Sequence, residues 1–293
     1  MDKDRQGDEK HIDEATGVET TGHEWDGIRE LNNPMPRWWL WTFYGTIAWA
    51  FGYMILYPAW PLITSATPGL LGYSSRGELN QDLAEVEQER AAMTEAVRAA
   101  SLPEILADEH LRTFAVAGGM AAYRINCSQC HGSGAQGAPG YPNLNDDAWI
   151  WGGDIESIYT TIAHGARDKI DPETRVSEMP AFGGMLSPIE VARTAAYVRT
   201  LSGLESEPEK AAAGAPLFAD NCAACHGPGG AGGREVGAPS LADAIWLYGS
   251  SEAEIAQQIQ AARHGVMPAW IHRLGDVTVK KLAVFVHSLG GAE

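Results

Sequence analysis

The chain has 293 residues, of which 20% are charged, and a formal net charge of −17. This length allows two small domains with additional segments, and the composition is that of an ordered globular protein. The negative charge excludes nucleic acid as a partner, because the phosphate backbone would repel the chain. It suits a basic protein partner instead. All four cysteines fall in two short motifs, so we expect neither a disulfide scaffold nor a lone reactive thiol.

A polar leader at residues 1–37 begins the chain, and we expect it to be disordered. Residues 38–60 are predicted to form a transmembrane anchor, because no charged residue occurs from position 38 to position 75. About 20 apolar residues span the roughly 30 Å hydrocarbon core of a bilayer. Tryptophan and tyrosine side chains crowd both ends of the segment, as in the aromatic belts of membrane proteins. The sequence therefore predicts a single membrane-spanning helix.

The connecting segment, residues 61–106, contains a predicted helix at 78–100. Its apolar residues recur at helical steps of four and three, with Arg90 as an interruption: Leu79, Leu83, Val86, Met93 and Val97. We expect this stripe to pack on the chain's own domains, and docking on another subunit is the alternative.

The rest of the chain is one pattern written twice, predicted as domains at 107–203 and 211–293 with a linker at 204–210. Each copy has a glycine and an aromatic residue before a Cys-x-x-Cys-His motif, and a Met-Pro pair and a closing helix after it. The second copy lacks the polar stretch 166–178 of the first. We interpret that stretch as a variable surface loop.

Cys-x-x-Cys-His places two thiols where they can bond both vinyl groups of a haem, with the adjacent imidazole at the iron. A zinc site would need a second cysteine pair, and each motif is instead followed by a Met-Pro. The sequence thus predicts two covalently bound haem c groups. The cysteines are Cys127 and Cys130 in the first motif and Cys222 and Cys225 in the second, with His131 and His226 as proximal iron ligands.

Met179 and Met267 are the predicted sixth ligands, because they hold equivalent positions in the repeat. A thioether ligand raises the potential and closes the iron to oxygen, as an electron relay requires. Met185 is a rival for the first haem, and the equivalent His164 and His264 make bis-histidine ligation an alternative. Crossed ligation, in which each repeat's methionine serves the other repeat's haem, also stays open.

Each repeat resembles class I cytochrome c. In that family the glycine–aromatic pair packs against the last helix, and a proline carbonyl accepts a hydrogen bond from the proximal imidazole. The matching residues are Gly119 with Tyr123, Gly214 with Phe218, Pro142 and Pro239.

The order of anchor, helix and two cytochrome domains resembles that of subunit III of cbb3-type cytochrome c oxidase, the dihaem subunit. Two stretches beside the anchor carry the same resemblance: Glu30-Leu-Asn-Asn-Pro-Met-Pro-Arg-Trp-Trp39 and Tyr57-Pro-Ala-Trp-Pro61. The resemblance implies a mainly α fold with a single N-terminal transmembrane helix, a periplasmic helix and two tandem class I cytochrome c domains. It also implies the ligand set Cys127, Cys130, His131, Met179, Cys222, Cys225, His226 and Met267.

The implied function is electron transfer without catalysis by the chain itself. Electrons would come from a basic donor cytochrome c and pass through the two haems to the monohaem and haem–copper subunits. Haem attachment outside the cytoplasm, general for c-type cytochromes, places the haem domains in the periplasm and the N-terminus in the cytoplasm, across a bacterial inner membrane. The alternatives are a dihaem carrier for another respiratory complex, a dihaem peroxidase and an oxygen sensor; the last two need an open iron.

Overall fold

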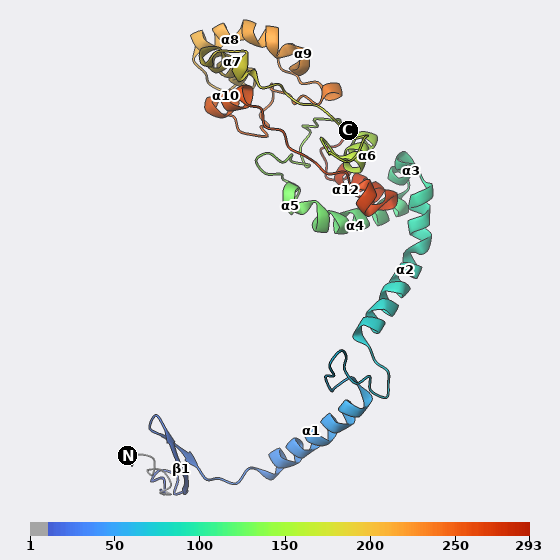
Figure 1. The fold of residues 1–293 in the computed structure, drawn as a ribbon, viewed down its shortest axis with the longest axis vertical. Helices are drawn as coiled ribbons and strands as arrows, with labels where there is room; N and C mark the ends of the chain where they lie inside the picture. Colours follow the sequence, from blue (N-terminus) through green and yellow to red (C-terminus); the bar gives the residue numbers. More distant parts are fainter. Residues whose placement is uncertain (1–10) are drawn as a thin grey trace. The chain divides into compact units, whose positions relative to one another are not determined.

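The computed structural model describes residues 11–293, so the first ten residues of the predicted leader lie outside the described residues. The chain divides into two compact units, Met1–Glu87 and Gln88–Glu293. The structure is mainly helical, as predicted (Figure 1). The first unit contains β1 (Thr20–Trp25), β2 (Ile28–Leu31), α1 (Arg37–Leu56) and the start of α2 (Ser75–Ala99).

Strands β1 and β2 form an antiparallel hairpin. Trp25 pairs with Ile28, so the turn consists of Asp26 and Gly27, with φ of 49° and 84°. Asp-Gly is a favoured sequence for a two-residue turn in which both residues have positive φ. The expectation of a disordered leader is therefore wrong for these residues, because the strands are too short and polar to show an alternating pattern.

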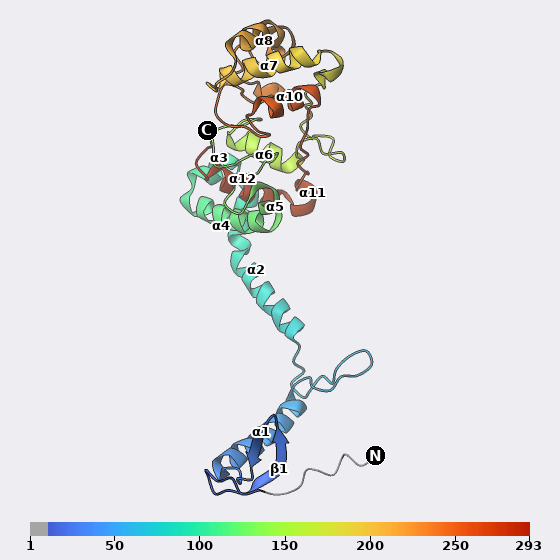
Figure 2. The same cartoon turned by 90° about the vertical axis from the view of Figure 1, so that its left-hand side faces the viewer.

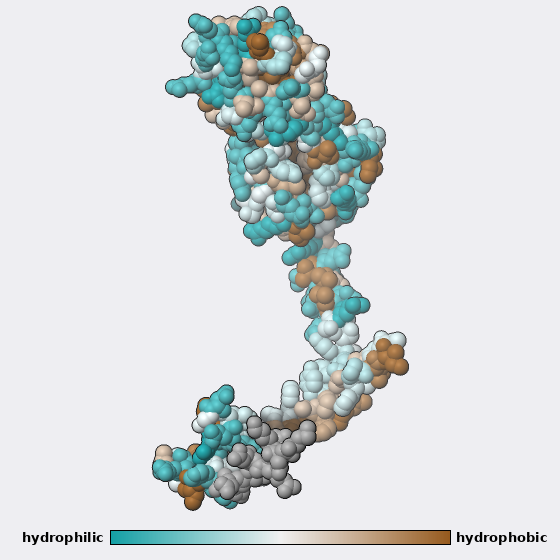
Figure 3. All heavy atoms as spheres, turned by 60° about the vertical axis from the view of Figure 1, so that its left-hand side comes forward, coloured by the Kyte–Doolittle hydropathy of each residue, from teal (hydrophilic) through white to brown (hydrophobic). Residues whose placement is uncertain are grey.

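Helix α1 has 20 residues, and none of them is buried in the described structure. It ends just before Pro58, which lacks the N–H that a continuing helix would need. Pale and brown atoms cover this helix in Figure 3, whereas teal atoms dominate the surface of the second unit. Among residues 11–293, no helix is both long enough and apolar enough to cross a membrane.

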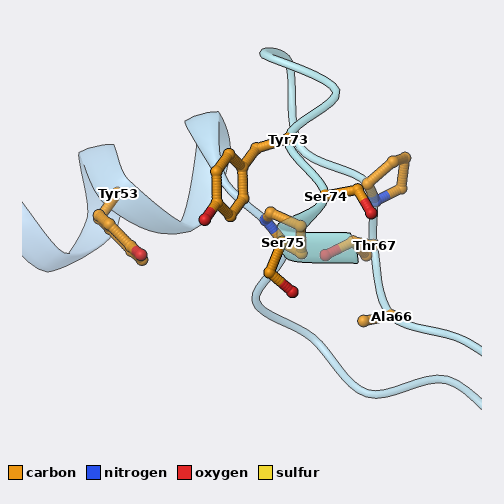
Figure 4. Close-up of a pocket in the computed structure, with 8 residues that line it drawn as sticks. Tyr53, Ala66, Thr67, Tyr73, Ser74 and Ser75 are labelled. Atoms are coloured by element: carbon orange, nitrogen blue, oxygen red, sulfur yellow. The ribbon is translucent and has the colours of Figure 1, made fainter. Parts of the chain in front are cut away.

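A shallow pocket lies between the end of α1 and the chain that leads to α2 (Figure 4). Tyr53 and Tyr73 line it together with small polar side chains that include Thr67 and Ser74. No cysteine or histidine is among its lining residues. The pocket therefore offers neither the thiols nor the imidazole that a c-type haem site needs.

Helix α2 confirms the helix predicted at 78–100 and continues from the first unit into the second. Val97 near its end is fully buried, whereas Leu79 and Leu83 near its start are more than half exposed, at 55% and 57%. The expectation that the apolar stripe packs on the chain's own domains is therefore confirmed for the C-terminal end of the helix and wrong for its start.

The second unit holds the remaining elements. They are α3 (Leu102–Ala107), α4 (Glu109–Asn126), α5 (Ser128–His131), α6 (Ile155–His164), η1 (Phe182–Gly184), α7 (Pro188–Leu201), α8 (Pro208–Asn221), α9 (Ala223–His226), η2 (Arg234–Val236), α10 (Glu252–Gln260), α11 (Ile271–Leu274) and α12 (Asp276–His287). These helices build two separate hydrophobic cores.

The first core comprises α3, α4, α6, α11 and α12 together with the end of α2, and the second comprises η1, α7, α8 and α10. Figure 2 shows these two groups as separate bodies within the second unit. Helix α4 packs against α12, and α7 packs against α8. Each core therefore combines elements of both sequence repeats: the closing helix of each repeat packs on the opening helix of the other.

Candidate haem-binding sites

Each Cys-x-x-Cys-His motif forms a short helical turn at the end of a longer helix. Cys127 ends α4 and begins α5, with φ −112° and ψ −31°. Cys222 ends α8 and begins α9 with nearly the same angles, φ −116° and ψ −34°. A glycine with positive φ follows each histidine: Gly132 at 82° and Gly227 at 76°. The two motifs thus share one local backbone, which directs both thiols and the imidazole in the same way at each site.

The proximal imidazoles are held by proline carbonyls. His131 Nδ1 lies 2.9 Å from the Pro142 carbonyl oxygen, and His226 Nδ1 lies 3.0 Å from that of Pro239. A carbonyl can only accept, so Nδ1 carries the proton and Nε2 keeps its lone pair for iron. Burial lowers the pKa of both imidazoles, although the carbonyl bonds oppose this effect. These hydrogen bonds confirm the partners expected from the class I resemblance.

The four cysteine thiols are free. Burial, helped by the neighbouring cysteine of the same motif, raises the pKa of Cys127 and of Cys222 to about 11. Cys130 and Cys225 are exposed. Two unpaired thiols beside an imidazole with a free Nε2 fit a covalently attached haem. Within residues 11–293, no group of three or more His, Cys, Asp or Glu side chains could hold a metal ion directly.

The glycine–aromatic pairs pack against a closing helix, as the resemblance implies. A Cβ on Gly119 would lie 2.1 Å from the Lys281 carbonyl oxygen, and the ring of Tyr123 lies 5.4 Å from that of Phe285. The resemblance to class I cytochromes is therefore confirmed for this contact in the first core.

The second pair makes the same contact. A Cβ on Gly214 would lie 2.0 Å from the Arg193 carbonyl oxygen, and the rings of Phe218 and Tyr197 are 5.4 Å apart. In each case the closing helix comes from the other repeat. Sequence reasoning did not predict this exchange of helices.

Each methionine lies in the same core as the closing helix that comes after it in the chain. Met267 packs against the first core, which contains Cys127 at its edge, and Met179 packs against the second core, which contains Cys222. Met185 is 62% exposed. The structure thus places each predicted methionine against the core that holds the motif of the opposite repeat, and it leaves Met185 at the surface.

Two histidines, His164 and His264, hold equivalent positions in the two repeats. His164 Nδ1 lies 3.2 Å from Asp171 Oδ2, and His164 Nε2 lies 3.2 Å from Glu173 Oε2. His164 therefore has both ring nitrogens facing carboxylates, and His264 is exposed. This arrangement favours methionine over histidine as sixth ligand.

Two Cys-x-x-Cys-His turns with carbonyl-bound imidazoles, each beside a methionine segment on a helical core, define a c-type cytochrome. The family comparisons then specify the kind of cytochrome. Residues 114–198 and 209–286 match the model of cytochrome c oxidase, cbb3-type, subunit III. Residues 17–64 match the N-terminal domain of cytochrome oxidase-cbb3, FixP. The chain belongs to the family of subunit III of cbb3-type cytochrome c oxidases.

Individual relatives agree over almost the whole length. The chain is 59% identical to the cbb3-type cytochrome c oxidase subunit FixP of Rhizobium meliloti, over 97% of this chain and 98% of that protein. It is 53% identical to the subunit CcoP of Cereibacter sphaeroides, over 94% and 95% of the two chains. The resemblance recognised in the sequence is therefore confirmed. The chain is an accessory electron-transfer subunit of the cbb3 type, and a carrier for another respiratory complex is disfavoured.

Proposed function

We propose that the chain carries two haem c groups, bound through Cys127 and Cys130 and through Cys222 and Cys225. His131 and His226 are their proximal ligands. The observation that carries this proposal is the pair of imidazole–carbonyl bonds, which leave Nε2 of each histidine free to bind iron. When bound, each haem supplies one-electron chemistry. The chain's residues hold the haem, fix the imidazole tautomer and exclude water from the iron.

We propose further that the sixth ligands are crossed. Met267 serves the haem on Cys127 and Cys130, and Met179 serves the haem on Cys222 and Cys225. The support is packing: each methionine lies against the core that contains the opposite repeat's cysteine motif. Sulfur ligation on both irons suits a relay and leaves no position open to oxygen or peroxide, which argues against a peroxidase or a sensor.

The relay connects a donor cytochrome c with the other oxidase subunits. The net charge of −17 favours a basic donor, because complementary charge accelerates encounter. The relatives' names place them in cbb3-type oxidases. By this kinship the electrons leave this chain for the monohaem cytochrome subunit and then the haem–copper subunit.

Helix α1 is the proposed membrane anchor in a bacterial inner membrane, with the N-terminus cytoplasmic and the haem sites periplasmic. The support is its length of 20 residues, its lack of buried residues and the uncharged sequence from position 38 to position 75. Six of its residues are Trp or Tyr, whose N–H and O–H groups lower its hydropathy and favour the lipid–water interface. Extraction of membranes at alkaline pH tests it: an anchored chain stays in the pellet, and release into the supernatant contradicts the anchor.

The ligand assignment can be tested in chains that keep one haem. The double variant Cys222→Ala/Cys225→Ala retains the first motif. Crossed ligation predicts that adding Met267→Ala abolishes the sulfur-to-iron charge-transfer band of the ferric haem, whereas adding Met179→Ala leaves it. The reverse result would assign the methionines within their own repeats. If neither substitution abolishes the band, another residue is the sixth ligand.

If the one-haem chains do not accumulate, the two-haem chain can be labelled with ¹³C-methyl methionine. In the ferrous state the ring current of a haem shifts a bound methionine methyl far upfield. Crossed ligation predicts nuclear Overhauser contacts from the Met267 methyl to α4 and α6, and from the Met179 methyl to α8 and α10. Contacts in the opposite sense would exclude the crossed assignment.

A further inference from the structure

The polar stretch 166–178 of the first repeat, absent from the second, is an ordered loop. The Arg167 N–H donates to the Arg175 carbonyl at 2.8 Å, and the Arg175 N–H donates to the Gly165 carbonyl at 3.2 Å. Asp168 Oδ1 accepts from the N–H groups of Ile170 and Asp171 at 2.7 and 3.0 Å. These bonds close the loop on itself. It is therefore more constrained than the variable surface loop that the sequence suggested.

This 166–178 loop binds the segment that contains Met267. Ala166 and Met267 exchange two backbone N–H···O bonds of 2.9 Å each. Asp168 Oδ2 accepts from the Ala269 N–H at 3.0 Å, two residues beyond the methionine. Arg167 Nε donates to the Gly265 carbonyl at 2.5 Å, two residues before it. The loop thus fixes the backbone at Met267 and on both sides of it.

A buried carboxylate adds a second connection. Asp171 is 4% exposed, and its Oδ2 lies 3.2 Å from His164 Nδ1 and 3.1 Å from His272 Nε2. His164 ends α6, and His272 lies on α11, which follows the methionine segment. A buried carboxylate is stable when hydrogen-bond donors surround it. The cluster therefore ties the chain after Met267 to α6 of the same core.

The Met179 segment is held less closely. Two residues before Met179, the Ser177 carbonyl accepts from Arg167 Nη1 at 3.0 Å and the Ser177 hydroxyl donates to the Val236 carbonyl. Within the described residues 11–293, the backbone groups of Met179 and Ala181 make no hydrogen bond, and Phe182 O accepts only from the next turn, at Met185 and Leu186. The repeat position opposite the 166–178 loop is the short connection between His264 and Met267, so the second repeat has no equivalent loop. The two methionines thus differ in how firmly their backbone is held.

We propose that the 166–178 loop positions Met267 on the iron of the haem bound to Cys127 and Cys130, with Asp168 as the principal positioning residue. This inference rests on the crossed ligation proposed above. The loop keeps that haem six-coordinate, whereas the sulfur of Met179 is the one more easily displaced by an external ligand.

Carbon monoxide binding to the ferrous two-haem chain in detergent tests the proposal. Asp168→Ala removes the carboxylate that accepts three hydrogen bonds from backbone N–H groups. We expect it to raise the affinity of one haem for carbon monoxide on the order of tenfold. The same variant should weaken the sulfur charge-transfer band of that haem and lower its potential. Asp154→Ala is the matched control: Asp154 caps α6 through the Ser157 N–H at 2.9 Å and makes no bond to the Met267 segment. It should leave all three readouts unchanged.

Double variants identify which haem responds. In the Met267→Ala variant the methionine is already gone, so adding Asp168→Ala should not change carbon monoxide binding further. In the Met179→Ala variant, adding Asp168→Ala should allow carbon monoxide to bind a second haem. Equal effects in both backgrounds, or Asp168→Ala behaving as Asp154→Ala, would overturn the positioning role. The experiment on the one-haem chains described above tests crossed ligation independently of this one.

Should Asp168→Ala fail to fold, Asp168→Asn gives the same decision. Its amide oxygen can still accept from Ile170 and Asp171, which preserves the loop, but its NH2 group would face the Ala269 N–H. If one haem of Asp168→Asn binds carbon monoxide more tightly than in the wild type, the positioning role is supported. Wild-type carbon monoxide binding and a wild-type potential in this variant contradict it.

Discussion

The two cores of the second unit contain equivalent parts but hold their methionine segments differently. In both, a Cys-x-x-Cys-His turn follows a helix, a proline carbonyl fixes the imidazole, and a glycine–aromatic pair contacts a closing helix. In the first core, Met267 lies in a segment bonded at Gly265, Met267 and Ala269. In the second, the segment is bonded at Ser177, but within residues 11–293 the backbone of Met179 and Ala181 makes no hydrogen bond. Two sites with one chemistry can thus differ through their surroundings, and in haem proteins such surroundings tune the ligand bond and the potential.

The largest expected effect comes from replacing the glycines at which the opening and closing helices cross. Gly119→Ala and Gly214→Ala would each place a methyl group about 2 Å from a carbonyl oxygen of the closing helix. Overpacking against backbone should cost each variant about 3 kcal/mol in the free energy of unfolding. Denaturant unfolding followed by circular dichroism measures the cost, and the charge-transfer bands show which core is affected.

Gly118→Ala provides the control for this comparison. A Cβ there would meet only the Lys281 side chain, which can move aside. Alanine also favours the helix by roughly 0.5–1 kcal/mol relative to glycine, so this variant should be close to wild type. A Gly119→Ala protein as stable as Gly118→Ala would contradict the close approach of α4 and α12.

A pH dependence of intermediate size should separate the first core from the second. Backbone N–H groups of Ile170, Ala269 and Asp171, with Arg273 nearby, hold the pKa of Asp168 below its ordinary value of 3.8. A depressed carboxyl pKa contributes stability above the unfolded-state value, and that contribution is lost as pH falls through the folded-state value. The stability difference between wild type and Asp168→Asn should therefore be full at neutral pH and shrink below pH 3.8.

Thermal unfolding at a series of pH values checks this expectation. Asp171 faces the same loop, and its pKa is also lowered: burial raises it, but the Glu173 N–H and the two imidazoles outweigh burial. Comparing the two proteins at each pH cancels Asp171 and the other carboxylates to first order. A difference that stays constant down to acid pH would show that the charge of Asp168 does not matter.

The smallest effect concerns one hydroxyl group. Tyr123 Oη donates to the Gly132 carbonyl at 2.7 Å, and burial raises the pKa of Tyr123 to about 12. Phe218 occupies the equivalent position in the second core and makes no such bond. Tyr123→Phe should cost about 1 kcal/mol, measured by denaturant unfolding.

The reverse substitution completes the comparison. Gly227 has nearly the same backbone angles as Gly132, so Phe218→Tyr would place a hydroxyl near an equivalent carbonyl. We expect it to be tolerated or slightly stabilising. A Phe218→Tyr protein that loses more stability than Tyr123→Phe would show that the two cores are packed differently around the aromatic ring.

The local features of both sites could be predicted from the sequence, because they depend on short motifs. The Cys-x-x-Cys-His turns and the carbonyls of Pro142 and Pro239 are examples. The exchange of closing helices could not. Tyr197 and Phe285 are equivalent aromatic residues on similar helices, so each can pack on either glycine–aromatic pair. Pairing within a repeat and pairing between repeats would bury the same kinds of surface.

The role of the 166–178 loop was hidden for a different reason. Its residues read as a polar insertion, and the backbone groups that Asp168 and Arg167 bind belong to residues about 100 positions later in the chain. Composition identifies such a stretch as a loop, but no local pattern reveals a hydrogen bond between segments so far apart. The partners of His164 were hidden in the same way, since the carboxylates around it lie within this loop.

The exchange of helices also alters the order in which the chain can complete each core. All elements of the second core lie in one continuous stretch, from Met179 to Ile259, in which the methionine and closing helix precede the cysteine motif. The second core is thus a circularly permuted cytochrome c inserted into the first. In the topology proposed above, the part of the chain that follows α1 crosses the membrane in the order of its sequence, so the inserted core is complete before α12 has emerged. In that topology the first cysteine motif stays open to the proposed haem attachment until α12 closes over it.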